Sequence, residues 1–135
     1  MIMILLDTHV LLWAIYNSDN LPNDILDMIQ DTESVFFSVV SLWEIQLKHS
    51  IDSNFDFDCD EVKELAEKSG YIVLPVIPEH ISALKRVKQK NGAPVHKDPF
   101  DRILLAQSLV QNAKLVTADH LLPYYEQEIV YFRKN

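Results

Sequence analysis

Residues 1–13 have the sequence MIMILLDTHVLLW. An unbroken apolar run at residues 2–6 ends at Asp7, which is typical of a strand buried on both faces of a parallel sheet. Residues 8–16 follow at once, with apolar side chains at helical spacing. A buried strand that leads directly into a helix favours an α/β fold.

The same alternation of strands and helices continues along the chain. We expect further strands at residues 35–38, 72–76, 114–117 and 129–132. We expect further helices from residue 22 and over residues 40–48, 60–69, 79–90 and 99–112. This order predicts a single α/β domain over residues 1–135, with about five strands in a mainly parallel sheet flanked by helices.

Composition restricts the class of protein. The chain has 135 residues, of which 48% are hydrophobic, and this suits one globular domain. No apolar run is long enough to span a bilayer and no signal peptide is recognisable, so we expect a cytoplasmic protein without a membrane partner. Cys59 is the only cysteine, which excludes an intramolecular disulfide. With two glycines in the chain, P-loop and dinucleotide-binding fingerprints are absent.

Charge is distributed unevenly. The net charge of −8 argues against broad, non-specific binding to nucleic acid, because phosphate contacts need Lys and Arg. Basic residues nevertheless gather late in the chain, at Lys85, Arg86, Lys88, Lys90, Lys97 and Arg102. Two interpretations stay open for this run: a solvated helix face, or a phosphate-binding rim beside a functional site.

Four acidic residues are the candidate functional group: Asp7, Glu44, Asp101 and Asp119. Asp7 and Asp119 follow predicted strands, while Glu44 and Asp101 lie in helices next to strands. All four can meet beyond the carboxyl ends of the strands, where open parallel sheets bind ligands. Carboxylates gathered there repel one another unless a cation neutralises them. The pattern therefore predicts a divalent metal site and metal-assisted hydrolysis.

Each acid also has a purely structural interpretation. Asp7 and Asp119 can cap the segments that follow them, and Glu44 can pair with Lys48 one helical turn away. Asp101 can be the third-position acid of a capping box. These roles are common one at a time, but four of them converging on one sheet edge would be a coincidence.

Several neighbours are secondary candidates. Asp98 precedes Pro99, so we expect it to cap a helix rather than to bind metal. The hydroxyls of Thr8 and Thr117, and that of Ser41, can orient a carboxylate or a metal-bound water.

Histidine and tryptophan contribute less to the functional prediction. His9 and His96 lie near the acids in sequence but lack zinc-hydrolase spacing. Trp13 and Trp43 are expected in the core.

Four ordered segments carry a family resemblance: LLDTHVLLW, SLWEIQLK, HKDPFDRILLAQ and LVTAD. They resemble the PIN domain and, more narrowly, VapC-like ribonuclease toxins of VapBC-type toxin–antitoxin pairs, over residues 4–132. The resemblance implies a five-stranded parallel sheet and an acidic pocket that binds Mg²⁺ or Mn²⁺ through Asp7, Glu44, Asp101 and Asp119. It places the third acid at Asp101, because the motif continues from the acid into an Ile/Leu-Ala helix. It also implies homodimers and inhibition by a cognate antitoxin protein.

The expected activity is that of a metal-dependent endoribonuclease, a hydrolase that cleaves RNA phosphodiester bonds with activated water. Asp7, Asp101 and Asp119 would hold one or two Mg²⁺ ions, and Glu44 would bind a second metal or position the water. The RNA backbone would be guided by Lys85, Arg86, Lys88 and Arg102. The alternative is a catalytically inactive PIN-fold interaction module.

Overall fold

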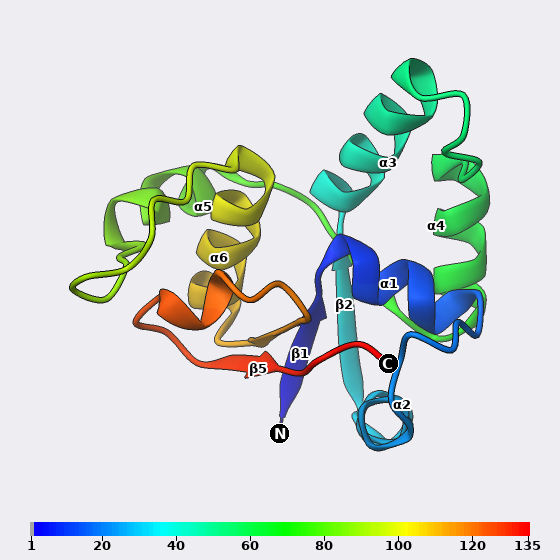
Figure 1. Cartoon of the computed structure of the whole chain (residues 1–135), viewed down its shortest axis with the longest axis horizontal. Coiled ribbons are helices and arrows are strands. Elements are labelled where there is room, and N and C mark those ends of the chain that lie inside the picture. The colour runs from blue at the N-terminus through cyan, green and yellow to red at the C-terminus, as the bar shows by residue number, and fades with distance from the viewer. Residues whose placement is uncertain (1) are drawn as a thin grey trace.

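The computed structural model describes residues 2–135, and these form a five-stranded sheet flanked by helices (Figure 1). The strands are β1 (Met3–Leu6), β2 (Ser34–Ser38), β3 (Ile72–Leu74), β4 (Lys114–Thr117) and β5 (Ile129–Tyr131). The helices are α1 (Thr8–Ile15), α2 (Asn23–Asp31), α3 (Val39–Ile51), α4 (Cys59–Lys68), α5 (Pro78–Ala83) and α6 (Pro99–Gln111), with 3₁₀ turns η1 (Leu84–Arg86) and η2 (Leu122–Tyr124).

Strand β1 lies at the centre of the sheet. The strand order is β3-β2-β1-β4-β5, and every pairing is parallel, so the predicted α/β fold is confirmed. Leu5 stands opposite Phe36 of β2 and Leu115 of β4. The chain proceeds from β1 to one side of the sheet and later crosses to the other, so the carboxyl ends of β1 and β4 form a switch point where ligands bind in such sheets.

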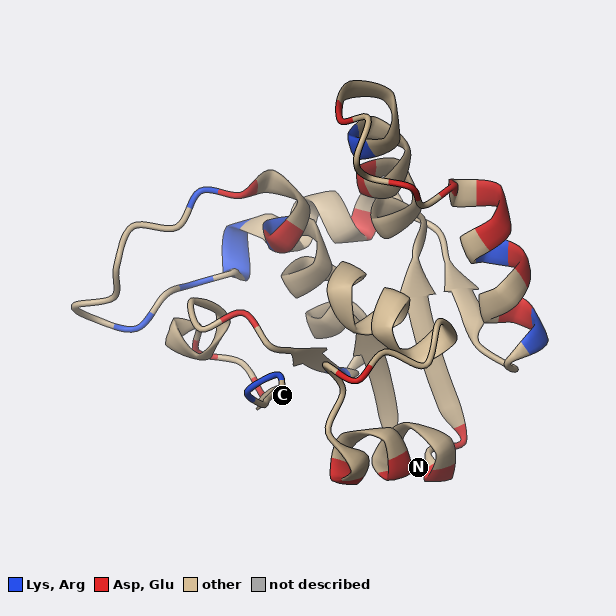
Figure 2. Cartoon of the chain, turned by 45° about the vertical axis from the view of Figure 1, so that its right-hand side comes forward, with Lys and Arg blue, Asp and Glu red and all other residues tan. Residues whose placement is uncertain are grey.

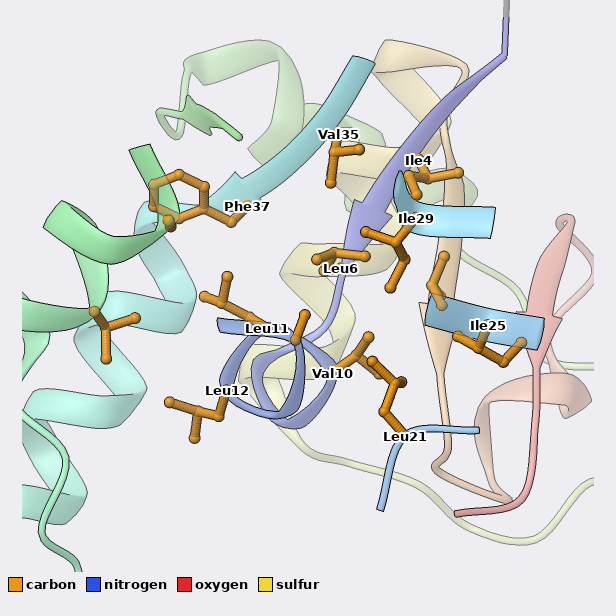
Figure 3. Packing of buried hydrophobic residues seen from close by; sticks show 14 of the residues in the cluster. Ile4, Leu6, Val10, Leu11, Leu12, Leu21, Ile25, Ile29, Val35 and Phe37 are labelled. Atoms are coloured by element: carbon orange, nitrogen blue, oxygen red, sulfur yellow. The ribbon is translucent and has the colours of Figure 1, made fainter. Parts of the chain in front are cut away.

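The sheet separates two hydrophobic cores because side chains alternate along β1. Ile4 and Leu6 face the core built with α1, α2, α3 and α4, which Figure 3 shows from close by. Leu5 faces the opposite core, built with α5 and α6 and including Leu105 and Leu115. A strand apolar on both faces is needed for this arrangement, and burial of each large aliphatic side chain contributes about 1.5–3 kcal/mol.

The helix predicted over residues 79–90 is wrong in its second half. Helix α5 ends at Ala83, η1 ends at Arg86, and the chain then turns away from helical geometry. Gln89 forms an antiparallel bridge with Tyr125, and the Lys90 amide donates to the Tyr124 carbonyl at 2.6 Å. Backbone partners from a distant segment thus replace those that a longer helix would have supplied.

Two smaller differences also have physical causes. Strand β3 ends at Leu74 rather than at residue 76, because Pro75 has no backbone N–H to continue the ladder. Trp43 is 63% exposed, so its predicted place in the core is wrong. It lies on the outer face of α3, where its ring packs edge-on against Phe100 with centroids 4.8 Å apart.

Within residues 2–135, the helices are all too short or too polar to cross a membrane.

Candidate functional site

A cleft of about 440 Å³ opens at the carboxyl ends of β1 and β4, at the switch point of the sheet. It brings together the four predicted acids, which come from the end of β1, α3, α6 and the end of β4. Its lining residues are Asp7, Thr8, His9, Trp13, Glu44, Lys48, Asp98, Asp101, Ala118, Asp119, His120 and Lys134. Residues separated by more than a hundred positions therefore share one concave acidic surface.

Asp7 is both a helix cap and a cleft residue. Its Oδ1 accepts a hydrogen bond of 2.9 Å from the Val10 amide at the start of α1, and its Oδ2 accepts one from the Thr117 hydroxyl. Burial raises the pKa of Asp7 to about 6, while the hydrogen bonds from Thr117 and Val10 act in the opposite direction. The carboxyl is thus held in a single orientation in a place that disfavours its charge.

Glu44 is held by a hydroxyl and an ammonium group. The Thr8 hydroxyl donates to Glu44 Oε1 at 2.6 Å and lies 2.9 Å from the Ser41 hydroxyl. Lys48 Nζ lies 3.4 Å from Glu44 Oε2, so the structural role expected for Glu44 coexists with its place in the cleft. Thr8 contacts this carboxylate directly, whereas Ser41 contacts it only through Thr8.

Asp101 is the most perturbed acid of the cleft. It lies in the first turn of α6, where Asp98 caps the helix and accepts hydrogen bonds from the Phe100 and Asp101 amides at 2.9 and 3.3 Å. Burial raises the pKa of Asp101 to about 8, and the negative charges of Asp98, Asp119, Asp7 and Glu44 add to this effect. The capping role predicted for Asp98 is confirmed, although its side chain also borders the cleft.

Asp119 lies two residues beyond β4. Its Oδ1 accepts from the Leu121 amide at 2.9 Å, and its own amide donates to the Thr117 hydroxyl oxygen at 3.0 Å. Thr117 therefore joins Asp119 to Asp7 across the ends of two neighbouring strands. This explains why a buried hydroxyl stands at the end of an otherwise apolar strand.

His96 is a residue next to the acidic cleft whose importance the sequence did not reveal. Its side chain is 5% exposed, and its Nε2 lies 3.0 Å from Asp101 Oδ2. One ligand atom each of His96, Asp101 and Asp119 lie within 4.8 Å of one another. The only signal in the sequence was a histidine five positions before the acid, in an irregular segment that lacks helical periodicity.

The donor atoms fit a divalent cation. Several carboxylates and one imidazole converge, and the raised pKa values of Asp7 and Asp101 reflect burial and mutual repulsion that a cation would relieve. Carboxylate oxygens in a site open to water are the ligands that Mg²⁺ and Mn²⁺ prefer.

The predicted RNA-guiding cations lie elsewhere. None of the four lines the acidic cleft: Lys85, Arg86, Lys88, Arg102. Basic residues lie in η1 and in the loop after it, whereas acidic residues outnumber basic ones in α2 and α4 (Figure 2). The cations that do border the cleft are Lys48 and Lys134, and the latter comes from the C-terminal segment, which the sequence alone did not connect with the site. A role of the four predicted cations in RNA binding stays a prediction.

The comparisons with known proteins agree with this architecture. The structure of VapBC2 from Rickettsia felis, bound to a DNA fragment from their promoter, is similar with a TM-score of 0.68 and 13% sequence identity, covering 99% of this chain and 100% of that chain. The structure of DNA-bound VapBC from Salmonella typhimurium has a TM-score of 0.63 and 18% identity, covering 98% of both chains. No curated protein matches the sequence. The family model for the PIN domain matches residues 4–126, and the chain therefore belongs to the PIN domain family.

Proposed function

We propose that this chain is a metal-dependent endoribonuclease and the toxin of a toxin–antitoxin pair. The observation that carries the proposal is the convergence of Asp7, Glu44, Asp101 and Asp119 on one cleft at the switch point of a PIN fold. An interaction module has no need to bury mutually repelling carboxylates, since their charge lowers the stability of the fold.

Some of the cleft residues would bind the cation, and others orient the carboxylates that bind it. Asp7, Asp101 and Asp119 would hold Mg²⁺ or Mn²⁺, and Glu44 would take part in a second site or position the attacking water. Bound there, the cation would supply Lewis-acid chemistry, with activation of water and neutralisation of charge on the phosphodiester. Thr117 fixes Asp7 and Thr8 fixes Glu44, so these two carboxylates are oriented before substrate arrives.

Local positive charge supports a polyanionic substrate despite the net charge of −8. Lys48 and Lys134 border the cleft, where they can contact phosphates next to the cleaved bond. The more distant basic residues Lys85, Arg86 and Lys88 would contact RNA phosphates farther from the cleaved bond.

The toxin assignment rests on the solved structures that have a similar fold. Both similar solved structures described above are VapBC assemblies, and they match over nearly the whole chain. We infer by analogy that this chain pairs with a cognate antitoxin protein and forms a homodimer.

Cleavage can be tested directly with the purified chain. A mixed-sequence single-stranded RNA and its DNA counterpart would be incubated with Mg²⁺, with Mn²⁺ or with EDTA. We expect metal-dependent cleavage of RNA in preference to DNA, and its loss in Asp101→Asn. Asp24→Asn, which changes an exposed acid in the first turn of α2, is the matched control and should retain activity.

Two outcomes would count against the proposed nuclease site. Equal cleavage by wild type and Asp101→Asn would point to a contaminating ribonuclease and remove the support for this site. No metal-dependent cleavage of single-stranded, transfer or ribosomal RNA would favour an inactive PIN-fold module.

A further inference from the structure

A chain of hydrogen bonds runs behind the acidic cleft, from Tyr125 through His96 to Asp101, and the Arg102 side chain acts on the tyrosine hydroxyl. His96 Nδ1 lies 2.9 Å from the Tyr125 hydroxyl, and His96 Nε2 lies 3.0 Å from Asp101 Oδ2. Tyr125 is 1% exposed, and the Arg102 side chain opposes the rise in the pKa of its hydroxyl that burial causes. Both ring nitrogens of a nearly buried imidazole are therefore occupied.

The donors and acceptors determine the direction of this chain. An ionised Asp101 carboxylate only accepts, so His96 Nε2 must donate to it and Nδ1 must accept from the Tyr125 hydroxyl. The single phenolic proton is then available to His96 Nδ1, which makes Nδ1 the acceptor and places the imidazole proton on Nε2. That proton points at Asp101 Oδ2, and Oδ1 is the oxygen left for a ligand in the cleft.

We propose that His96, locked by Tyr125, is a positioning residue that orients the Asp101 carboxylate for divalent cation binding. This inference rests on the proposed function because it assumes that Asp101 holds the cation. It goes further by assigning a role to three residues outside the acidic set: His96, Tyr125 and Arg102. It also gives Arg102 a place behind the site rather than on an RNA-binding surface.

The position of the segment around His96 supports this role. His96 lies in the irregular stretch between η1 and α6, which is attached to the rest of the fold where Gln89 bridges Tyr125. The His96 and Tyr125 rings also pack edge to face, with centroids 5.7 Å apart. One tyrosine thus anchors both the backbone and the imidazole, and the start of α6 completes the frame around Asp101.

The experiment measures Mn²⁺ affinity by calorimetry and by electron paramagnetic resonance, with Mn²⁺ alone as the probe and the full chain as the protein. His96→Leu removes the donor, whereas His96→Gln retains an amide N–H at about the position of Nε2. We expect His96→Leu to weaken Mn²⁺ binding by about 10–100-fold, the usual effect of losing a partner of a metal ligand. His96→Gln should recover most of this loss, which a role in packing alone would not explain.

Two controls make the result specific. His49→Gln changes an exposed histidine in the last turn of α3 that does not line the cleft, and it should leave Mn²⁺ affinity unchanged. Tyr125→Phe keeps the ring in place but removes the hydroxyl, so it should reproduce part of the loss of Mn²⁺ affinity expected for His96→Leu. It tests the proposal independently if His96→Leu folds poorly. The ¹⁵N shifts of His96 in the Mg²⁺-loaded protein, where Asp101 is ionised, should report a proton on Nε2.

Three results would overturn the proposal in distinguishable ways. Wild-type affinity in folded His96→Leu and in Tyr125→Phe would remove the positioning role and leave the proposed nuclease intact. Nitrogen coupling from His96 in the pulsed spectrum of bound Mn²⁺ would make His96 a ligand instead of a positioning residue. No Mn²⁺ binding by the wild type would overturn both this proposal and the metal dependence of the proposed function.

Discussion

Asp101 shows at the scale of a single residue how a binding site lowers the stability of a fold. Its carboxyl is largely buried among four other acids, and its pKa is raised to about 8. In the unfolded chain the same group ionises near its ordinary value of 3.8 in water. The folded protein must therefore keep a proton on Asp101 or accept a charge in an unfavourable place.

Replacement of this carboxyl should stabilise the metal-free protein. We expect Asp101→Asn to raise the free energy of unfolding at pH 7 by on the order of 2 kcal/mol, because the amide carries no charge and can still contact His96. Urea unfolding in EDTA measures the change. The exposed control Asp24→Asn should stay within about 0.5 kcal/mol of wild type. A less stable Asp101→Asn protein would contradict this electrostatic account.

Thr117 controls the second perturbed acid. Its hydroxyl donates to Asp7 Oδ2, and this hydrogen bond favours the ionised carboxylate. We expect Thr117→Val, which keeps the shape of the side chain, to raise the pKa of Asp7 above its value of about 6. A carbon-detected NMR titration of the Asp7 carboxyl in EDTA measures this shift. Thr32→Val removes a hydroxyl that donates to the Met28 carbonyl and should leave Asp7 unchanged.

At the scale of an element, the start of α6 combines a structural and a functional acid three residues apart. Asp98 caps the helix through the amides of Phe100 and Asp101, and Pro99 occupies the first turn, where no backbone donor is missed. Asp98 precedes the helix, whereas Asp101 lies within its first turn and lines the cleft.

Two substitutions of Asp98 separate capping from metal binding. Asp98→Ala should lower the free energy of unfolding by about 1 kcal/mol, because two amides lose their acceptor. Asp98→Asn, an equally good cap, should be at least as stable as wild type, because it removes a negative charge that repels Asp101, and it should reduce Mn²⁺ affinity far less than Asp101→Asn does. Urea unfolding and calorimetry provide the two measurements. Asp58→Ala, which uncaps α4 far from the cleft, is the matched control for stability. A loss of Mn²⁺ binding in Asp98→Asn as large as that in Asp101→Asn would assign Asp98 to the ligands.

At the scale of the whole molecule, the two raised pKa values couple stability to pH. Asp7 and Asp101 bind protons more tightly in the folded than in the unfolded state, because both pKa values lie above 3.8. The stabilising effect of protonation is therefore lost as pH rises through about 6 and about 8. His80 has a lowered pKa and acts in the opposite direction, but only at pH values below its ordinary 6.5.

Thermal unfolding in EDTA should reveal this coupling between pH 7 and pH 8.5, where Asp101 dominates. We expect the melting temperature to fall as pH rises, with a slope in unfolding free energy of at most about 1.4 kcal/mol per pH unit. The Asp101→Asn protein should show a flatter profile. Mg²⁺ should raise the melting temperature of the wild type more at pH 8 than at pH 6, since protons compete with the cation. A wild-type profile that is flat in EDTA would contradict the raised pKa of Asp101.

Local sequence determined most of the helices and strands and the mainly parallel character of the sheet. The apolar run of β1 and the Asp98-Pro99 start of α6 are short-range signals, because side-chain periodicity and capping act within a few residues. The placement of acids after strands likewise predicted a shared cleft, since parallel strands all end at one edge.

Only the tertiary structure decided which other side chains join the acids. The contacts of His96 with Tyr125 and Asp101, the exposure of Trp43 and the end of helical geometry after Arg86 depend on segments distant in sequence. The arrival of Lys134 at the cleft has the same origin. Local propensity is weak beside burial and long-range hydrogen bonding, so packing overrides it wherever distant segments meet.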